Sequence, residues 1–274
     1  MGASAEKVLN QNKEIKMKKL LFWMILILVV SVAGLTAEDN VDQLIAKYLE
    51  ARGGLAKIQA IQTMRVTGKM MAGPQELPIS FEFKRPNQVR LEITFQGQSI
   101  VQAFDGKQGW SINPLAGYQG GKKDAQPMGP DETKEFEVQA DMDGPLVDYA
   151  KKGHKVEYAG QESVEGSQAY KLKVTLKNGT ITTMFLDADT YLDVKDSSKM
   201  KLRDTEVEND VIYSDFKEVG GMMIAHSMEI KAKGAPAGQK MIFEKVELNV
   251  PVDAMRFVMP EQAPETPKAP GVSS

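Results

Sequence analysis

Apolar and polar residues alternate with a period of two along most of this chain, and most clearly over residues 77–114. One run covers residues 77–84, and a second resumes at 89–95 after a break at Arg85-Pro86-Asn87. Such a period places one face of a strand in an apolar interior and the other in water. Short segments at 100–104 and 109–112 follow, separated by Gly-containing turns, so this stretch predicts an antiparallel meander.

The same period returns after residue 154. Strands are predicted at 154–159, 169–176, 180–186, 193–200, 209–218, 222–231 and 240–249, in addition to a first strand at 64–71. The pairs Asn178-Gly179 and Gly220-Gly221 predict tight turns between neighbouring strands. A sheet of this many strands must curl, close or split into two layers.

Helical periodicity is confined to short segments. Asn40 is predicted to cap a helix whose apolar residues form one stripe from Val41 to Leu49, ended by Gly53-Gly54. A shorter helical turn is predicted over 55–61. Residues 117–129 indicate an exposed loop, and residues 131–152 a hinged helical flap that is interrupted at Gly144-Pro145.

These elements predict the α+β class. Antiparallel strands lie on both sides of a helical insertion, and the N-terminal helix has a single apolar stripe, which indicates a strongly curved antiparallel sheet with helices covering its concave face. We see no repeat and no linker, so residues 38–260 are expected to form one domain. Residues 261–274 combine Pro, Gly, Ser and charge without periodicity and indicate a disordered tail.

The first 37 residues have the pattern of a secretory signal peptide. Lys16, Lys18 and Lys19 precede an apolar run at 20–30, and small residues follow up to Ala37, where cleavage is expected. Cleavage after Gly34 and an uncleaved anchor are the alternatives. A membrane-spanning helix requires about 20 apolar residues, more than the run at 20–30 provides. Because Met17 is a natural start, residues 1–16 are interpreted as an extension from a misplaced initiation codon.

Composition limits the kinds of function. The chain is 42% hydrophobic and 26% charged, an ordinary globular balance, and it has no cysteine, which excludes disulfides, thiolate metal sites and cysteine nucleophiles. Residues 1–37 carry five lysines and two glutamates, so their removal changes the formal net charge from −3 to −6. This acidic balance gives no support for nucleic-acid binding, and with the export signal it predicts a soluble periplasmic protein.

Two patches carry a resemblance to a known family. The order and spacing of Phe83-Lys84-Arg85-Pro86-Asn87, Ser99-Ile100-Val101, Asp105-Gly106-Lys107, Trp110 and Asn113-Pro114 are similar to those of the outer-membrane lipoprotein carrier family (LolA-like). Val252-Asp253-Ala254 with Phe257 and Pro260 resembles that family's C-terminal signature. The resemblance implies an unclosed half barrel whose mouth is covered by helices and forms an apolar pocket able to hold a lipid.

The resemblance also gives Arg85 a role. In the family pattern this arginine lies at the cavity mouth, where its donors hold the helical lid shut until cargo enters, and Pro86 fixes the end of the strand. The alternative is a solvated arginine at a strand end. Trp110 matches a family position and is expected either in the barrel core or in the cavity wall, with no preference between the two.

Apolar side chains on the alternating faces are expected to line the cavity or to form ordinary core. The candidates for the lining are Phe81, Phe83, Leu91, Ile93, Phe95, Phe104, Met222, Met228 and Phe243. Methionine suits a cavity that accepts irregular acyl chains, but alternating apolar residues are more often plain core. Each buried methylene of a chain contributes about 0.8 kcal/mol, so such a pocket could bind acyl chains without any charged contact.

No motif for catalysis is present in the sequence. His154 and His226 stand alone, without a zinc-binding spacing, and there is no GxSxG element. Asp187-Ala188-Asp189 lacks the glycine and the distant glutamate of a calcium loop and indicates a turn. We therefore expect a protein that is not an enzyme and has no metal and no cofactor.

The expected function is that of a periplasmic carrier. It would take acylated lipoproteins or other lipids from an inner-membrane ABC-type release complex and pass them to an outer-membrane acceptor. The alternative is a module of the same superfamily that binds lipid without transporting it, or that senses envelope stress. The cargo is what separates the two.

Overall fold

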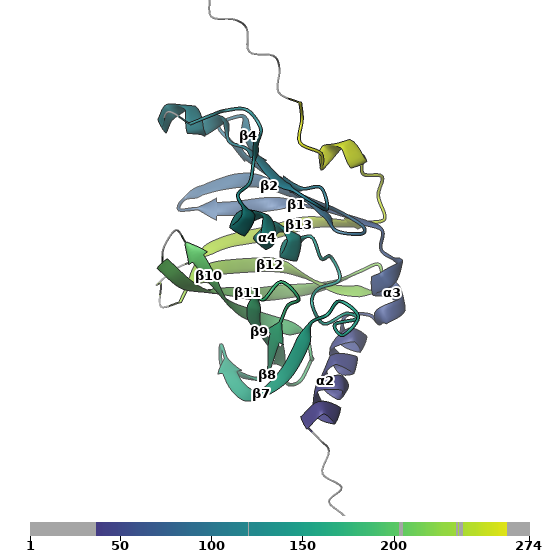
Figure 1. Cartoon of the computed structure of the whole chain (residues 1–274). Coiled ribbons are helices and arrows are strands. Elements are labelled where there is room, and N and C mark those ends of the chain that lie inside the picture. Colours follow the sequence, from purple (N-terminus) through teal and green to yellow (C-terminus); the bar gives the residue numbers. More distant parts are fainter. Residues whose placement is uncertain (1–36, 120, 203–204, 234, 236–237, 262–274) are drawn as a thin grey trace, which may run out of the picture. The chain divides into compact units, whose positions relative to one another are not determined.

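Thirteen strands of the described chain form one antiparallel sheet. The structure, a computed structural model, describes residues 37–261 apart from 120, 203–204, 234 and 236–237. The chain divides into two units, Met1–Asn40 and Val41–Ser274, and the second holds the sheet. The strand order is β6-β5-β4-β3-β2-β1-β13-β12-β11-β10-β9-β8-β7 (Figure 1). Because β6 and β7 lie at opposite edges and do not pair, the curved sheet stays an unclosed barrel, as the family resemblance implies.

The elements have the following bounds. The strands are β1 Thr63–Ala72, β2 Gln75–Lys84, β3 Gln88–Phe95, β4 Gln98–Phe104, β5 Gly109–Ile112, β6 Gln126–Pro127, β7 Lys155–Val164, β8 Ser167–Thr175, β9 Ile181–Asp187, β10 Asp193–Leu202, β11 Thr205–Val219, β12 Met222–Ala232 and β13 Gln239–Leu248. The helices are α2 Ala37–Ala51, α3 Leu55–Ala60 and α4 Pro130–Gln139, with 3₁₀ turns η1 Pro114–Gln119 and η2 Ala254–Arg256. Every strand predicted from the alternation is present, with bounds shifted by a few residues, and β6 is an addition.

The N-terminal helix differs from its prediction at one end. Helix α2 begins at Ala37, so Asn40 lies inside the helix and the prediction of Asn40 as its cap is wrong. At the other end, Gly53 and Gly54 take φ angles of 115° and 95° and stop the helix, as predicted. A Cβ on Gly53 would lie 2.2 Å from the carbonyl oxygen of Gly221, so this position also needs glycine for close backbone approach.

Two segments between the halves of the sheet also differ. The flap (residues 131–152) is helical only in α4, and residues 141–153 form turns, because Gly144 takes a φ of 83° and Pro145 has no N–H with which to continue a helix. The loop at 117–129 is more ordered than predicted. It contains β6, and it buries Ala125 and Met128 in the apolar clusters beside it.

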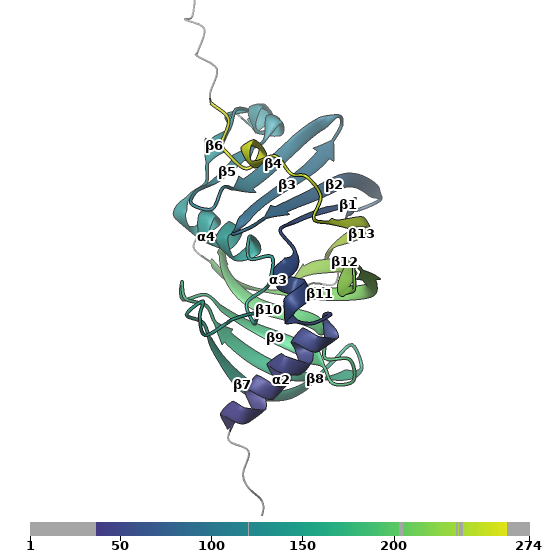
Figure 2. The ribbon, with the colours of Figure 1, turned by 90° about the vertical axis from the view of Figure 1, so that its right-hand side faces the viewer.

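The concave face of the sheet is covered by helices from two parts of the chain. The stripe of α2, from Val41 to Tyr48, packs on β8 and β9 in a cluster that includes Leu172, Val174, Met184 and Leu186 (Figure 2). Helix α4 places Phe136 and Ala140 against Phe83, Val89 and Phe104 of β2, β3 and β4. This arrangement confirms the expected position of the helices.

The C-terminal segment, residues 249–261, covers the opposite face of β1 to β5. It follows strand β13 and crosses the sheet, where it accepts hydrogen bonds from Thr63, Arg65, Lys84, Arg90 and Trp110. The family-like residues Val252 and Phe257 are both buried there. The second patch of the resemblance therefore corresponds to a structural layer.

Three predictions fall largely on residues that are not described. The signal peptide and the start extension concern residues 1–37, and the tail begins at Glu261, the last described residue. They remain predictions, as does the count of domains. Among the helices that are described, none combines the length and apolar character that crossing a bilayer requires.

Candidate functional site

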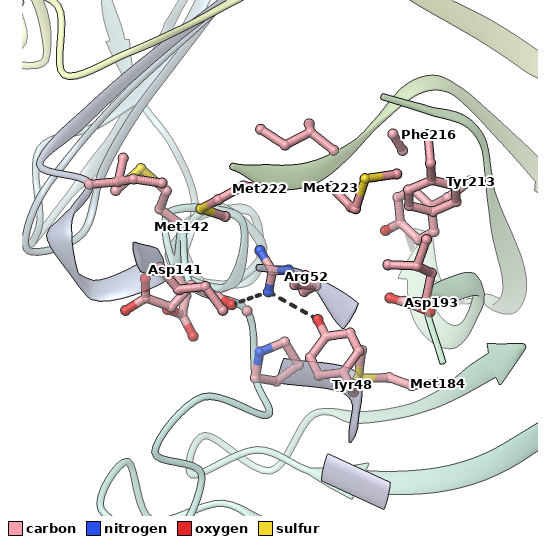
Figure 3. A pocket seen from close by; sticks show the side chains of 18 of the residues that line it. Tyr48, Arg52, Asp141, Met142, Met184, Asp193, Tyr213, Phe216, Met222 and Met223 are labelled. Carbon is pink, nitrogen blue, oxygen red and sulfur yellow. Dashed lines mark hydrogen bonds between the residues drawn. The ribbon is translucent and has the colours of Figure 1, made fainter. Parts of the chain in front are cut away.

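A cavity of about 250 Å³ lies between the concave face and the segments that cover it (Figure 3). Its walls come from α2 and α3 with the residues that follow them, from the flap, and from strands β1 and β9 to β12. The lining residues are Tyr48, Arg52, Ile58, Ile61, Met64, Asp141, Met142, Asp143, Gly144, Pro145, Met184, Leu192, Asp193, Asp196, Tyr213, Phe216, Met222, Met223, Ile224 and Ala225. Most of these side chains are apolar, and five of them are methionines.

Arg85 joins the two segments that cover this cavity. Its Nη1 and Nη2 donate to Oδ2 and Oδ1 of Asp143 in the flap at 2.8 and 2.5 Å. Its Nε donates to the carbonyl oxygen of Ile61 at 2.5 Å, and Nη2 also donates to that of Ile58 at 3.0 Å. The hydrogen bond to Asp143 raises the pKa of Arg85. One guanidinium thus closes the end of α3 onto the flap.

Arg52 holds the same flap residue from the other side. Its Nη1 donates to the carbonyl oxygen of Asp143 at 2.7 Å and to the hydroxyl of Tyr48 at 3.0 Å. Figure 3 shows both bonds as dashed lines that meet at the Arg52 guanidinium. Because Arg85 takes the carboxylate of Asp143 and Arg52 takes its carbonyl, two arginines fix the position of one residue of the flap.

Further polar contacts hold the flap in shape. Lys152 Nζ donates to both carboxylate oxygens of Asp141, at 2.8 and 2.6 Å, and to the carbonyl oxygen of Gly144 at 2.9 Å. Gln59 of α3 donates to Asp148 Oδ2 at 2.9 Å. Apolar anchoring comes from Leu146 and Val147, which are almost fully buried. The flap is therefore attached by a few apolar side chains and by a set of polar bonds.

A group of acidic and phenolic side chains lies on the sheet side of the cavity. Tyr213 donates to Asp196 Oδ2 at 3.2 Å, and Asp193 borders the same space beside Tyr213 (Figure 3). Burial raises the pKa of Asp196 to about 7, and burial together with the charge of Asp196 raises that of Asp193 well above its usual range. Burial likewise raises the pKa of Tyr48 to about 12.

The alternation of residues places Asp193 and Asp196 in a predicted strand, 193–200, and gives neither of them a role. A signal was nevertheless present, because Asp196 pairs with Met184 across β9 and β10 and so shares the face that packs on α2. A carboxylate at an inward position of a half-buried strand is rare without a partner.

The residues predicted to line a cavity are divided between three groups, and Leu91 and Phe95 belong to none of them. Met222 alone among them borders the cavity described above. Phe83 and Phe104 pack under α4. Phe81, Ile93, Met228 and Phe243 belong to a third group on the same face, with Met70, Ile79 and Met241, while Leu91 is buried and Phe95 half-buried on strand β3.

The third group forms a strip on which none of the described helices packs. Its cluster contains only strand residues within the described chain, and Leu77, Phe81, Ile93, Met228, Ile230 and Phe243 remain half-buried. The rings of Phe81 and Phe83 stack at 6.2 Å, and Phe243 meets Phe81 edge-on at 5.9 Å. We refer to this group as the apolar strip.

Trp110 lies on the opposite face of the sheet. Trp110 pairs with Ala103 of β4, and the next residue in that strand, Phe104, packs against α4. Because neighbouring residues of a strand point to opposite faces, Trp110 points away from α4. The indole is 2% exposed and its Nε1 donates to the carbonyl oxygen of Phe257 at 2.6 Å. The sequence left Trp110 open between the barrel core and the cavity wall, and these contacts are those of a core residue.

The two histidines are held by backbone contacts far from each other. His154 Nδ1 accepts from the N–H of Lys177 at 3.1 Å, and His226 Nδ1 lies 3.0 Å from the carbonyl oxygen of Ile224. Within the described residues, no three His, Cys, Asp or Glu side chains come together in a group that could hold a metal ion.

Comparison with solved structures identifies the fold. A LolA superfamily protein from Nitrosomonas europaea superimposes with a TM-score of 0.53 at 10% identity, over 79% of this chain and 96% of the other. A domain named for outer-membrane lipoprotein sorting, from Vibrio parahaemolyticus, gives 0.51 at 11% identity, over 78% and 94%. A DUF1329 family protein from Desulfovibrio piger gives 0.50 at 12% identity, over 80% and 97%.

Comparison with protein families and with curated proteins gives no match. At 10–12% identity the likeness to the three structures is one of fold. The resemblance first noticed at two short patches is therefore confirmed in three dimensions: this chain has the unclosed-barrel fold of the LolA superfamily.

Proposed function

We propose that this protein is a periplasmic carrier that binds the acyl chains of lipids or lipoproteins on the concave face of its sheet. The observation that carries the proposal is the closure made by Arg85 and Asp143 over a cavity with mostly apolar walls. A solvated arginine, the alternative from sequence, would not bridge two covering segments. The apolar strip on the same face supplies additional surface for a chain.

The size of the cavity makes movement of the flap part of the proposal. Its volume of about 250 Å³ lies below the 300–1,000 Å³ that is common for ligand pockets. Acyl chains therefore enter only when the flap moves away from the sheet. The polar bonds of Arg85, Arg52 and Lys152 can be exchanged for water at small net cost, because such bonds contribute roughly 0.5–3 kcal/mol each.

Release of the acyl chain also involves only a small net change in free energy. Each methylene that leaves the protein for another apolar environment exchanges one favourable contact, about 0.8 kcal/mol, for another. Transfer between membranes then needs no reaction and no cofactor, only a closed and an open position of the flap. The proposed donor is an inner-membrane ABC-type release complex, and the proposed receiver is an outer-membrane acceptor. The fold and the predicted export signal support both.

The test is to identify the cargo. Protein exported to its own periplasm would be purified without detergent and weighed by native mass spectrometry. We expect a fraction of molecules to carry an acylated lipoprotein. A free lipid in its place would favour a lipid-binding or sensing module without transport. Uniformly empty protein, from cells in which the envelope is intact, would contradict the proposal.

A further inference from the structure

The cavity contains two carboxylates that its own side chains leave incompletely bonded. Asp193 and Asp196 both border it, and in each of them the Oδ1 atom is buried and has no hydrogen-bond partner within the described chain. Asp196 Oδ2 accepts from Tyr213, and the backbone N–H of Lys195 donates to Asp193. A buried acceptor without a donor is destabilising, and more so if it is charged, so a ligand that supplies donors here would be stabilised.

The charged residues around Asp193 and Asp196 show which ligand charge the cavity could accept. Arg52, the residue after α2, is the cation that acts on Asp193, but its Nη1 bonds to Tyr48 and to the flap. Within the described residues that line the cavity, Asp141 pairs with Lys152 and Asp143 pairs with Arg85. Without a ligand, burial raises the pKa of both carboxyl groups and favours their protonated forms. When both are ionised, the single guanidinium leaves one negative charge without a matching cation.

The form of the site favours an organic cation over a metal ion. Two carboxylates provide too few oxygens for calcium or magnesium, which take six or more ligands including water. The phenolic rings of Tyr48 and Tyr213 also border the cavity, and aromatic faces attract ammonium groups. Methionine side chains complete the wall, and they suit an alkyl chain.

We propose that Asp193 and Asp196 bind the ammonium group of a cationic amphiphile, whose alkyl chain lies along Met184, Met222 and Met223. The inference rests on the proposed function, because it names the head group of the ligand that the cavity takes. An ammonium group donates up to three hydrogen bonds and brings the single positive charge that the site lacks. The same group on a short diamine would have no chain to bury in the apolar part of the cavity.

The test compares three ligands of equal chain length by calorimetric titration below their aggregation concentrations: decylamine, decanol and decyl sulfate. We expect decylamine to bind at least about tenfold more tightly than decanol, and decyl sulfate to bind more weakly than decanol, because a bond to a charged group is worth a tenfold factor or more. Propylamine, which lacks the long chain, serves as a probe for the ammonium group alone and is expected to bind more weakly than decylamine.

Two variants test whether the preference for decylamine depends on Asp196. Asp196→Asn keeps the size of the side chain and removes its charge, and it should abolish the preference for decylamine over decanol. Asp189→Asn, at an exposed position in the turn between β9 and β10, should keep the preference. Retention of decanol binding by Asp196→Asn shows that this variant is folded.

The outcomes distinguish the inference from the function on which it rests. Equal affinity for decylamine and decanol in the unchanged protein would overturn the ammonium site and leave the carrier proposal standing. Failure of all the long-chain ligands to bind would contradict the carrier proposal itself. If propylamine binds as tightly as decylamine, the site takes a small amine and the amphiphile is excluded.

The affinity for decylamine should also depend on pH. The groups that face the pair are Tyr48 of α2, Arg52 just after it, Tyr213 of β11, and Asp141 and Asp143 of the flap. Burial raises the pKa of Asp196 to about 7, and burial with the charge of Asp196 raises that of Asp193. Decylamine binding should therefore weaken as the pH falls from 8 to 6, whereas decanol binding should stay constant; equal trends for the two ligands would overturn the site.

Discussion

Arg85 and Asp143 lie 58 residues apart in the chain and form a two-pronged ion pair, with N–O distances of 2.8 and 2.5 Å. Arg85 follows strand β2, and Asp143 lies in the turns that follow α4. Their side chains are 23% and 12% exposed, so the pair is shielded from water on most sides. Because Arg85 also caps the carbonyl groups of Ile58 and Ile61, it is the group through which the closed flap can be loosened most selectively.

Asp143→Asn should loosen the flap without changing its volume. Removing one partner of a partly buried ion pair leaves Arg85 without its anion, and we expect the free energy of unfolding to fall by about 1–3 kcal/mol. Hydrogen exchange followed by mass spectrometry should show faster exchange over residues 141–153. The matched control is Glu157→Gln, which breaks an exposed pair with Lys155 on β7 and should leave stability almost unchanged. Equal exchange in the two variants would show that the pair of Arg85 and Asp143 does not hold the flap in place.

Stability should fall as the pH rises through the range in which Asp196 loses its proton. Its pKa is raised from the ordinary 3.8 to about 7 in the folded protein, so between these values the folded state holds a proton that the unfolded state has lost. This contribution is complete below pH 3.8 and is lost as the pH approaches 7, with a slope of at most about 1.4 kcal/mol per pH unit.

Urea unfolding at pH 5, 6, 7 and 8 measures this contribution when the unchanged protein is compared with Asp196→Asn. The variant should lose less stability over the series, and at pH 8 it should be the more stable of the two. Carboxyls with a lowered pKa, such as Asp148, act in the opposite direction but affect both proteins equally. Asp193 adds to the loss in the unchanged protein, because the charge of Asp196 contributes to its raised pKa. Parallel curves for the two proteins would show that Asp196 ionises normally.

Phe257 should hold the C-terminal layer against the outer face of the sheet. It is fully buried, and its carbonyl oxygen accepts the bond from Trp110. Phe257→Ala should cost about 3–5 kcal/mol. Besides Trp23 at the N-terminus, Trp110 is the only tryptophan of the chain, so its emission should shift to longer wavelength as the indole becomes wet. Val258→Ala, at an exposed neighbouring position, should leave both the emission and the stability unchanged.

Two adjacent glycines offer a test of the close approach between α2 and the β11–β12 turn. Both take positive φ angles, so alanine at either position is strained by about 1–2 kcal/mol. At Gly53 the new Cβ would also lie 2.2 Å from the carbonyl oxygen of Gly221, whereas at Gly54 it would meet nothing within 4 Å. Gly53→Ala should therefore be clearly more destabilising than Gly54→Ala in thermal unfolding. Equal losses would mean that the backbone can separate here at no cost.

The order and direction of the strands could be read from the sequence because they depend on local information. Alternation fixes which face of each strand is buried, and pairs such as Asn178-Gly179 fix where the chain reverses. The closure at Arg85 was reached through the resemblance alone. Its partner Asp143 was not predicted, because a contact across 58 residues leaves no periodic trace in a single sequence.

The distribution of apolar residues between cavity, apolar strip and core could not be predicted for a different reason. Phe83 and Phe81 lie on the same face of β2, yet one packs under α4 and the other lies in the apolar strip. The difference depends on where a helix from a distant part of the chain ends. Trp110 differs again, because its face is covered by residues that come almost 150 positions later.

Binding of an acyl chain under the flap is measured most directly by titration with a dansyl-labelled fatty acid, excited at the dansyl group. The account predicts saturable one-to-one binding, at least about tenfold weaker binding to Met222→Trp, which fills the cavity, and unchanged binding to Met255→Trp, whose position is 68% exposed. It also predicts faster association with Asp143→Asn, because the flap opens more often. Signal that never saturates, or saturable binding that Met222→Trp leaves unaltered, would contradict the claim that this space accepts a ligand.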